Sequence, residues 1–398
     1  MTKGFAADLQ DLDAENIFVY VGDAVRWDCL PRRIAERGTV RRTVASSIHS
    51  PASFASLVTG LHPPSHGVHS FTHTLEPSIS RLFDLNGYET RFVNSVREQG
   101  NSADPIFAVL GVEPDHDEPF ADLSKRFAVM ERGPGGHAPY DRRIETAPEY
   151  FQTRRGTDTS TIRSEYRSSV AADADLFERR LTELEERGML DDTLVVYTSD
   201  HGELVGEGGM LGHNAPMRPE LVYVPSVFIH PNLPTGRERS DEPFRHVDLL
   251  PTVLAALGEY EEWTSLDGTV GTEDHSIGPT FYKHQFLETR DSTPSLTLAY
   301  NGVWTDDGGY VFARTNRAER LAVLAGKLVT SAKRGYLRRH VPAAFRSYAA
   351  GDRTFGSPEC SLADATSLLS KVRTAGRNTT ERELSESAVE RLHDMGYI

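Results

Sequence analysis

The sequence predicts an α/β fold, a three-layer sandwich around a largely parallel mixed sheet, with a smaller C-terminal subdomain. Two short runs, NIFVYVG at Asn16–Gly22 and TLVVYTS at Thr193–Ser199, have the β-branched and aromatic content of buried strands. Between them, apolar residues from Ile162 to Leu184 recur at spacings of three and four, which is typical of a helix. Strands that alternate with helices favour a parallel sheet covered by helices.

The elements follow in order along the first two thirds of the chain. The first strand delivers Asp23 to a loop, and a helix is expected at Ser50–Thr59, closed by Gly60. Ser50 and Pro51 form a strong helix opening, with serine as the N-cap and proline at the first helical position. The same signals predict a helix at 78–86, strands at 88–93, 126–131 and 226–230, and a helix at 246–257.

The pattern weakens after residue 290, so we expect a larger α/β domain at 1–290 and a C-terminal subdomain at 291–398. Runs at 297–304 and 309–313 suggest edge strands, and residues 332–353 are basic and irregular. The basic segment from Arg334 to Arg346 fits a solvated helical face better than a contact with an anionic substrate or a membrane surface. Ser387 and Glu390 form a capping box for a final helix that ends at Gly396 and packs back.

Composition restricts the class of protein. The 398-residue chain has a formal net charge of −15, which argues against nonspecific binding to nucleic acid or anionic membranes. Only six of its 43 basic residues are lysines, which favours a salt-adapted protein over an ordinary acidic surface. Two cysteines, Cys29 and Cys360, make a disulfide scaffold or a Cys-based zinc site implausible.

Membrane and targeting signals are weak. No run approaches the roughly 18 apolar residues that a membrane helix needs. The N-terminal stretch MTKGFAADLQDLDAEN is polar and acidic and does not resemble a signal peptide. A cytoplasmic location is therefore expected, whereas the oligomeric state is not readable from the sequence.

Polar residues at two predicted strand ends suggest a metal site. Asp23 follows the first strand, and Asp200 and His201 follow the strand at Thr193–Ser199. Ligands gather at the carboxyl ends of strands in such sheets. Two carboxylates and one imidazole suit Ca²⁺, Mn²⁺ or Mg²⁺, with Zn²⁺ as a further option. The alternative is that Asp23 caps a loop and His201 begins a helix.

Three further residues are candidates for chemistry. Ser50 is either only a helix cap or a hydroxyl placed where a phosphate or sulfate binds, which a metal alongside would turn into a nucleophile. His137 in GPGGHAPYD and His213 in GMLGHNAP each lie in a Gly-rich loop that follows a strand. They are candidates for contacting an anion or protonating a leaving group, although lone histidines are usually structural.

Several segments, taken in order, resemble the sulfatase family of the alkaline phosphatase superfamily. They are NIFVYVGDAVRWD, ASLVTGLHPPSHGV, GGHAPYD, DDTLVVYTSDHGELVGEGGMLGH, HVDLLPTVLAALG and VERLHDMGYI, covering about residues 16–258 and the tail. The resemblance implies an alkaline-phosphatase-like fold and one divalent cation, Ca²⁺ before Mn²⁺, Mg²⁺ or Zn²⁺. It makes Asp23, Ser50, Asp200 and His201 metal ligands, Ser50 the nucleophile position, and His137 and His213 contacts to the substrate.

Two departures from the family pattern stand out. The family opens with two adjacent aspartates, but here Asp23 is followed by Ala24, and the next acid is Asp28. The family signature is Cys or Ser, any residue, Pro, any residue and Arg, and its first residue becomes formylglycine. Here the frame runs from Ser50 to Phe54, with proline one place early and phenylalanine instead of arginine. Formylglycine at Ser50 is therefore not expected.

Three functions remain open from the sequence. The leading one is a metal-dependent hydrolase of sulfate or phosphate-type esters, acting on a small anionic ester or on a sulfated or phosphorylated glycan. The second is a transferase that moves a phosphoryl-type group onto a glycan or lipid, because an unmodified serine favours phosphate chemistry or transfer. The third is a noncatalytic member of the family that binds a glycan or a protein.

Overall fold

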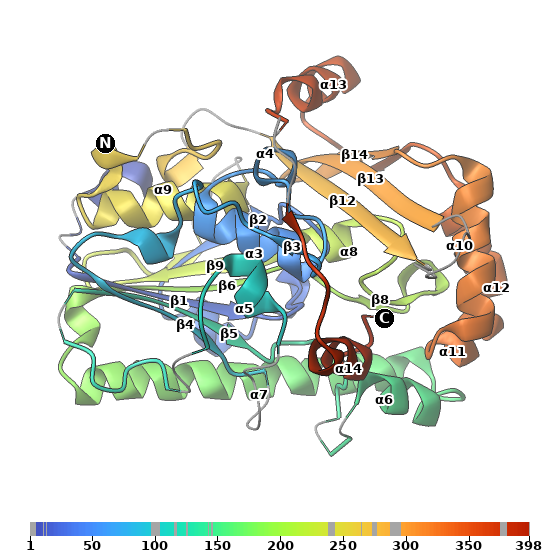
Figure 1. Ribbon diagram of the computed structural model, residues 1–398, viewed down its shortest axis with the longest axis horizontal. Coiled ribbons are helices and arrows are strands. Elements are labelled where there is room, and N and C mark those ends of the chain that lie inside the picture. Colours follow the sequence, from blue (N-terminus) through green and yellow to red (C-terminus); the bar gives the residue numbers. More distant parts are fainter. Residues whose placement is uncertain are drawn as a thin grey trace.

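The computed structural model describes residues 5–397 except 11, 13, 97–103, 115–117, 125, 142, 145, 238–242, 264, 273–276, 287–295 and 375–379. Figure 1 shows a large twisted sheet with helices on both faces and a smaller sheet beside it, flanked by further helices. The α/β sandwich with a smaller C-terminal sheet is confirmed.

The large sheet is mostly parallel. Its strands in the described residues are ordered β10-β2-β9-β6-β1-β5-β4, and β11 also pairs with β2. Only β9 runs antiparallel to its neighbours, β2 and β6. Their bounds are β1 (Asn16–Gly22), β2 (Thr39–Val44), β4 (Glu89–Asn94), β5 (Phe127–Gly133), β6 (Thr193–Ser199), β9 (Tyr223–Ile229), β10 (Gly236–Arg237) and β11 (Phe244–Arg245).

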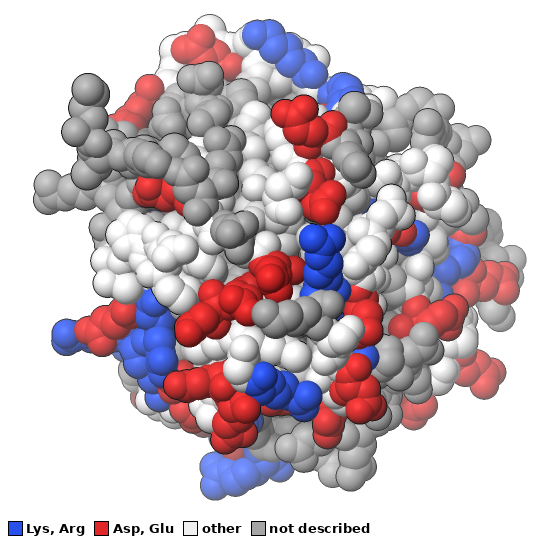
Figure 2. All heavy atoms as spheres, turned by 90° about the vertical axis from the view of Figure 1, so that its left-hand side faces the viewer, with Lys and Arg blue, Asp and Glu red and all other residues white. Residues whose placement is uncertain are grey.

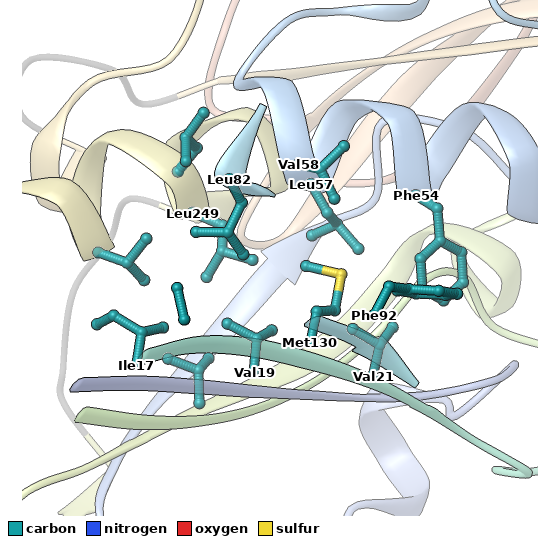
Figure 3. Close-up of a cluster of buried hydrophobic side chains, with 14 of the residues drawn as sticks. Ile17, Val19, Val21, Phe54, Leu57, Val58, Leu82, Phe92, Met130 and Leu249 are labelled. Carbon is teal, nitrogen blue, oxygen red and sulfur yellow. The ribbon is translucent and has the colours of Figure 1, made fainter. Parts of the chain in front are cut away.

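Burial on both faces explains why β1 is apolar throughout. Its alternate side chains, such as Val19, pack under α3 (Ser50–Thr59) and α9 (His246–Ala256), as Figure 3 shows for Ile17, Val19 and Val21. The intervening Phe18 and Tyr20 face α7 (Thr159–Glu186), the long helix along the other face of the sheet in Figure 1. Strands buried on both faces are typical of parallel sheets.

Helix α7 confirms the amphipathic stripe. Its predicted apolar positions are all buried: Ile162, Tyr166, Val170, Ala174, Phe177, Leu181 and Leu184. Shorter helices complete this part of the chain: α1 (Phe5–Gln10), α2 (Arg32–Ala35), α4 (Pro63–His66), α5 (Ile106–Leu110), α6 (Ala147–Thr153) and α8 (Pro219–Val222). Two short strand pairs lie apart from the large sheet: β7 (Leu204–Val205) with β8 (Leu211–Gly212), and β3 (His73–Thr74) with β16 (Thr380–Glu381).

The smaller sheet is antiparallel in the order β12-β13-β14-β15. Its strands are β12 (Gly278–Phe286), β13 (Leu296–Thr305), β14 (Gly308–Ala313) and β15 (Arg353–Gly356). The expectation of two edge strands is wrong, because β13 pairs with β12 on one side and with β14 on the other. The segment at 332–353 is mostly helical rather than irregular, and α10 (Arg317–Thr330), α11 (Arg334–Arg339) and α12 (Val341–Ala349) contact one another beside the sheet.

The tail returns to the large domain. After α13 (Leu362–Lys371), helix α14 (Glu386–Asp394) packs near α6, with the C-terminus beside it in Figure 1. Leu392, Met395 and Tyr397 belong to the main apolar cluster, on the face of the sheet that α3 and α9 cover. Ser385, not Ser387, caps α14, because its hydroxyl accepts from the backbone N–H of Ala388.

Two local predictions are wrong. Residues 78–86 form only a 3-10 turn at Leu82–Asp84, which is held by the reciprocal cap between Arg81 and Asp84. Ser50 is the first residue of α3 rather than its cap, and His49 occupies the cap position. No helix in the described part of the chain has the length and apolar character that crossing a bilayer requires.

Candidate metal and nucleophile site

Parallel strand register brings the predicted acidic residues together. Gly22 at the end of β1 lies opposite Ser199 of β6, so Asp23 and Asp200 leave the sheet side by side. Ligand atoms of Asp23, Asp200 and His201 all lie within 4.8 Å of one another, and the three side chains are buried. The alternative, in which Asp23 caps a loop and His201 begins a helix, does not explain why three buried polar groups meet at one point.

Two carboxylate oxygens lack a hydrogen-bond partner among the described residues. They are Asp23 Oδ1 and Asp200 Oδ2. A buried carboxylate oxygen without a donor is costly unless a cation or a proton satisfies it. Burial raises the pKa of Asp200, and a cation beside this carboxylate would favour its charged form. The donor set of two carboxylates and an imidazole therefore fits a divalent cation of the kind expected from the sequence.

His201 directs a nitrogen lone pair toward the carboxylates of Asp23 and Asp200. Its Nδ1 lies 2.9 Å from the carbonyl oxygen of Gly202, which can only accept, so Nδ1 carries the proton. The other nitrogen, Nε2, lies 3.1 Å from Ser50 Oγ. A neutral imidazole with bare Nε2 is the form that ligates metals.

Ser50 reaches the site from the first turn of α3. Pro51 follows it without loss of a hydrogen bond, because the first amides of a helix have no partner within the helix. The Ser50 hydroxyl bonds to His201 Nε2 and to the hydroxyl of Tyr397, at 3.1 Å and 2.8 Å, and the residue is fully buried. The structure thus places the predicted nucleophile beside the predicted ligands, at the positive end of a helix dipole.

The loop that carries His137 is fixed by backbone contacts. The N–H of Gly136 donates to the Asp23 carbonyl at 2.7 Å, and that of Gly135 donates to Asp173 on α7 at 2.7 Å. A Cβ on Gly135 would lie 1.9 Å from the Asp23 carbonyl oxygen, so only glycine fits. His137 Nδ1 donates to the Ala138 carbonyl at 2.8 Å, and burial lowers the pKa of His137 to about 4.

His213 is oriented by an acid that the sequence analysis missed. Glu203 accepts from the Tyr140 hydroxyl at 2.5 Å with one oxygen and lies 3.2 Å from His213 Nδ1 with the other. Burial raises the pKa of Glu203 to about 7, and burial also holds the pKa of His213 well below its usual value. His213 Nε2 is buried with no partner in the described residues, and the ring lies 4.3 Å from that of His201. The sequence signal available for Glu203 was its position in DHGE, two residues after His201.

Arg132 on β5 is the second residue that the sequence analysis missed. The guanidinium is fully buried and bonds to Asp23 at 2.5 Å and to Asp104 at 3.4 Å. It also lies 5.5 Å from the ring centroid of Phe54, the residue that stands where the family signature has arginine. A positive charge therefore reaches this part of the site from β5 instead of α3.

This ion pair divides the roles of the two aspartates. Burial alone would raise the pKa of Asp23, but the charges of Arg132, His137 and His201 and the hydrogen bond from Arg132 together lower it. Asp23 thus stays ionised with one oxygen on Arg132 and the other free. Asp200 instead accepts the backbone N–H of Ala24 at 2.9 Å, so the position of the missing second aspartate contributes only its backbone.

Asp28 takes no part in the site. It pairs with Arg26 at 2.8 Å, and its side chain is 59% exposed.

Tyr397, from the other end of the chain, covers the nucleophile. Its ring is stacked on that of His137 at 5.2 Å and lies 5.2 Å from that of His213. Its hydroxyl bonds to Ser50 Oγ and accepts weakly from Arg132 at 3.5 Å. The tail motif was recognised in the sequence, but no local signal tied its tyrosine to residues more than 260 positions earlier.

Two lysines approach from α10 and the turn before α11. Lys327 donates to the Asn214 carbonyl, and its partial burial lowers its pKa to about 7. The Lys333 ammonium passes the backbone of Gly212, where a Cβ would lie 2.0 Å from Nζ. Both ammonium groups therefore flank the loop that carries His213. In the basic segment that follows, Arg334, Arg338 and Arg339 donate to backbone carbonyls.

Comparisons with known proteins find relatives in the sulfatase family. The family model described as Sulfatase matches residues 121–259. Over 401 residues the chain is 30% identical to the low-salt glycan biosynthesis sulfotransferase Agl7 of Haloferax volcanii, covering 96% of each chain. A shorter match, 36% over 78 residues, is to the uncharacterized sulfatase YidJ of Escherichia coli, covering 20% of this chain and 15% of that protein.

Solved structures share the fold at low identity. One is the phosphonate monoester hydrolase of Agrobacterium radiobacter, with a TM-score of 0.54 and 16% identity over 84% of this chain and 96% of that chain. Another is BT4656 in complex with D-glucosamine-2-N,6-O-disulfate, with a TM-score of 0.54 and 15% identity over 84% and 98%. At such identities the likeness establishes the fold alone.

Proposed function

This chain belongs to the sulfatase family of the alkaline phosphatase superfamily, and we propose that it is a metal-dependent transferase that carries a sulfuryl group through Ser50 to a glycan hydroxyl. The observation that carries the proposal is the Ser50 hydroxyl, 3.1 Å from His201 Nε2 and beside two buried carboxylates with unpartnered oxygens. The proposal is also supported by the similarity over nearly the whole chain to a glycan biosynthesis sulfotransferase.

The first half-reaction loads Ser50 from an organic sulfate ester. Ser50 Oγ forms a bond to sulfur, and the bond between sulfur and the donor's alcohol oxygen breaks. The proton lost by Ser50 reaches the departing alcohol through His137, whose Nδ1 is bonded to the Ala138 carbonyl, or through His213, whose Nε2 has no partner among the described residues. The product is a sulfoserine and a free alcohol.

The second half-reaction moves the group to the acceptor. A sugar hydroxyl gives its proton to the same imidazole and attacks the sulfur, and Ser50 Oγ leaves and regains a proton. Asp23, Asp200, His201 and Ser50 would hold the divalent cation, which when bound supplies positive charge to the sulfuryl oxygens and lowers the pKa of a ligating hydroxyl. Of Ca²⁺, Mn²⁺, Mg²⁺ and Zn²⁺, we propose Ca²⁺ as the bound cation.

Arg132 is proposed as a positioning residue in this scheme. It holds Asp23 ionised and oriented, and it restores to the site the positive charge that Phe54 does not provide. The missing arginine and the Asp23-Ala24 pair were the two arguments for a noncatalytic protein. Arg132, beside Phe54, answers the first argument, and the retained ligands Asp23, Asp200 and His201 weigh against the second. A catalytic protein is therefore the better proposal.

The burial of the site favours transfer over hydrolysis. Ser50, Asp200 and His201 are fully buried, and Tyr397 covers the nucleophile. Exclusion of water protects a reactive ester from hydrolysis until an acceptor arrives. A sulfoserine also lacks the second hydroxyl by which a formylglycine hydrate would expel sulfate, so it depends on attack by an acceptor.

Hydrolysis of sulfate or phosphate-type esters is the second candidate. The same serine geometry supports it, because water can take the acceptor's place in the second half-reaction and phosphoserine is hydrolysed in line. The two candidates share the loading step and differ only in what removes the group from Ser50.

The test separates loading, transfer and hydrolysis. The purified protein is incubated in high salt with an aryl sulfate or aryl phosphate, with each of Ca²⁺, Mn²⁺, Mg²⁺ and Zn²⁺, and with or without methyl glycosides. Mass spectrometry measures the sulfated glycoside and the modified Ser50 peptide, and ion chromatography measures free sulfate and phosphate. We expect metal-dependent sulfated glycoside from the wild type and none from Ser50→Ala.

The matched control is Ser53→Ala on the same helix, whose buried hydroxyl donates to the Ser47 carbonyl away from the site. Free sulfate or phosphate without glycoside product would select the hydrolase. Undiminished product from Ser50→Ala would overturn both candidates.

A further inference from the structure

A concave site lies on the outer face of the β12–β13 hairpin, under the end of α13. It is a cavity of about 290 Å³. Small-molecule sites usually begin at roughly 300 Å³, so this cavity has room for one saccharide unit rather than for a longer chain. Figure 1 shows α13 and α4 on either side of the hairpin at this end of the molecule.

Strand register selects the residues that line it. Phe281 lies opposite Asn301 and Lys283 lies opposite Ala299, so these four side chains share one face of the hairpin. The other face carries Tyr282 and its neighbours into the apolar cluster of the C-terminal sheet. The cavity is also lined by Tyr282, which belongs to that cluster as well, and by Pro64, His69, Arg314, Leu369, Val372 and Thr374.

The lining is basic in an acidic protein. Lys283 and Arg314 both line the cavity, and no lining residue is acidic. Both cations are exposed, and neither has a carboxylate partner among the described residues. The whole chain has 58 acidic and 43 basic residues, and on the face in Figure 2 acidic groups stand among basic ones. Two unpaired cations in one cavity indicate an anionic ligand.

The neutral groups of the lining suit a sugar. With its amide oxygen turned toward Arg314, Asn301 accepts from Nε and Nη2 at 3.1 Å each, which fixes the guanidinium plane at the cavity. Burial lowers the pKa of His69 to about 4, so this imidazole is neutral and can hydrogen-bond a hydroxyl. Phe281 supplies the apolar surface on which a sugar ring packs.

The cavity wall is joined to the nucleophile by one hydrogen bond. His49 precedes Ser50, and its Nδ1 donates to the backbone carbonyl of His69 at 3.1 Å. The same loop therefore borders the cavity and the nucleophile. We propose that this cavity binds a saccharide unit carrying a carboxylate or a sulfate, next to the unit that reacts at Ser50. This rests on the proposed action on a glycan and adds the acidic character of its substrate.

The test measures binding without turnover. The full-length Ser50→Ala protein is titrated by calorimetry with methyl glucuronide, glucose 6-sulfate, methyl glucoside and inorganic sulfate. We expect the two acidic sugars to bind, with the stronger one identifying carboxylate or sulfate, and the neutral sugar to bind at least about tenfold more weakly, because a charge-assisted hydrogen bond is lost. Inorganic sulfate should also bind more weakly than the acidic sugars.

Variants locate the site. Lys283→Ala and Arg314→Ala, each in the Ser50→Ala background, should weaken binding of the acidic sugar by about tenfold or more. Arg317→Ala, which removes an exposed cation three residues from Arg314, should leave it unchanged. Thermal melting confirms that each variant is folded.

Three results would overturn the proposal: equal binding of methyl glucoside, equal binding of inorganic sulfate, or unchanged affinity in both pocket variants. Because Ser50 is already absent, these results are independent of catalysis. Acidic sugars that bind to the pocket of a protein without transferase activity would refute the proposed function and leave the pocket assigned.

Discussion

The candidate site has two walls of different origin. The sheet wall consists of Asp23, Arg132, Asp200 and His201 at strand ends, with Ser50 on α3. The C-terminal wall consists of Lys327, Lys333 and Tyr397. Sheet-wall residues are held by strand register and by buried ion pairs. Residues of the C-terminal wall instead reach the site from a helix, a turn and the tail, which pack on the larger domain.

This difference implies a division of labour. Groups that must hold a cation and a nucleophile within a few tenths of an ångström are placed on rigid elements. Groups that adapt to a substrate are placed on segments that vary more easily. We therefore expect substitutions in the sheet wall to abolish chemistry or stability and substitutions in the C-terminal wall to change it by smaller factors.

The largest effect is expected for Asp200→Ala. It removes a carboxylate that has no substitute in the sheet wall, so metal binding and activity should both be lost. Loss of a metal's several kcal/mol of charge stabilisation corresponds to roughly 10³-fold or more in turnover. Isothermal titration with Ca²⁺ and Mn²⁺ and the transfer assay measure the two losses.

Asp28→Ala is the matched control, because Asp28 lies in the same segment as Asp23 but pairs with Arg26 and is largely exposed. It should bind metal as the wild type does. Unchanged metal content in Asp200→Ala would refute the assignment of the cation to the sheet wall.

The next effect is expected for Arg132→Met. The change leaves Asp23 and Asp104 buried without their partner, and breaking a buried pair costs about 3–5 kcal/mol of unfolding free energy. Added metal should recover part of this loss, because a cation can neutralise Asp23. Denaturant unfolding with and without metal measures it.

Arg180→Met is the control, since it removes the partner of Glu131, the neighbouring β5 residue, on the other face. It should also destabilise, but without dependence on metal. If Arg132→Met were as stable as the wild type, Arg132 would have no role in organising the sheet wall.

The site residues that could be predicted from the sequence carry a local signal, whereas those that were missed depend on distant partners. Asp23, Asp200 and His201 were predicted because each directly follows a strand that is recognisable from a few neighbouring residues. Arg132 was missed because an arginine at a strand end has no local mark that distinguishes a buried ion pair from a surface charge. Its role depends on Asp23 and Asp104, which only the folded sheet brings within reach.

The same limit applies to the fold. The α/β sandwich was predicted because β1 and β6 are apolar on both faces and α7 has a regular stripe. Strand β12 was missed because GPTFYKHQF mixes proline, lysine and aromatic residues, and its strand state depends on pairing with β13. The helix expected at 78–86 did not form because a reciprocal side-chain cap closes the chain into a single 3-10 turn.

A moderate effect is expected for His213→Ala. His213 lies next to His201 and is held by Glu203, but its Nε2 has no partner in the described residues, which suits a proton relay. Loss of one acid–base group should lower turnover by about 10²-fold with little change in metal affinity. Equal loss of both would make His213 a ligand and move it into the sheet wall.

The smallest effect is expected for Tyr397→Phe, which keeps the ring on His137 and removes only the hydroxyl on Ser50. One hydrogen bond is worth about 0.5–1.5 kcal/mol, so turnover should change by no more than about tenfold, with metal affinity unchanged. Steady-state kinetics measure it against Tyr140→Phe, which removes another buried hydroxyl, the one that orients Glu203. A loss of turnover from Tyr397→Phe as large as that from Asp200→Ala would contradict the proposed difference between the two walls, because the tail would then supply a group on which the chemistry depends.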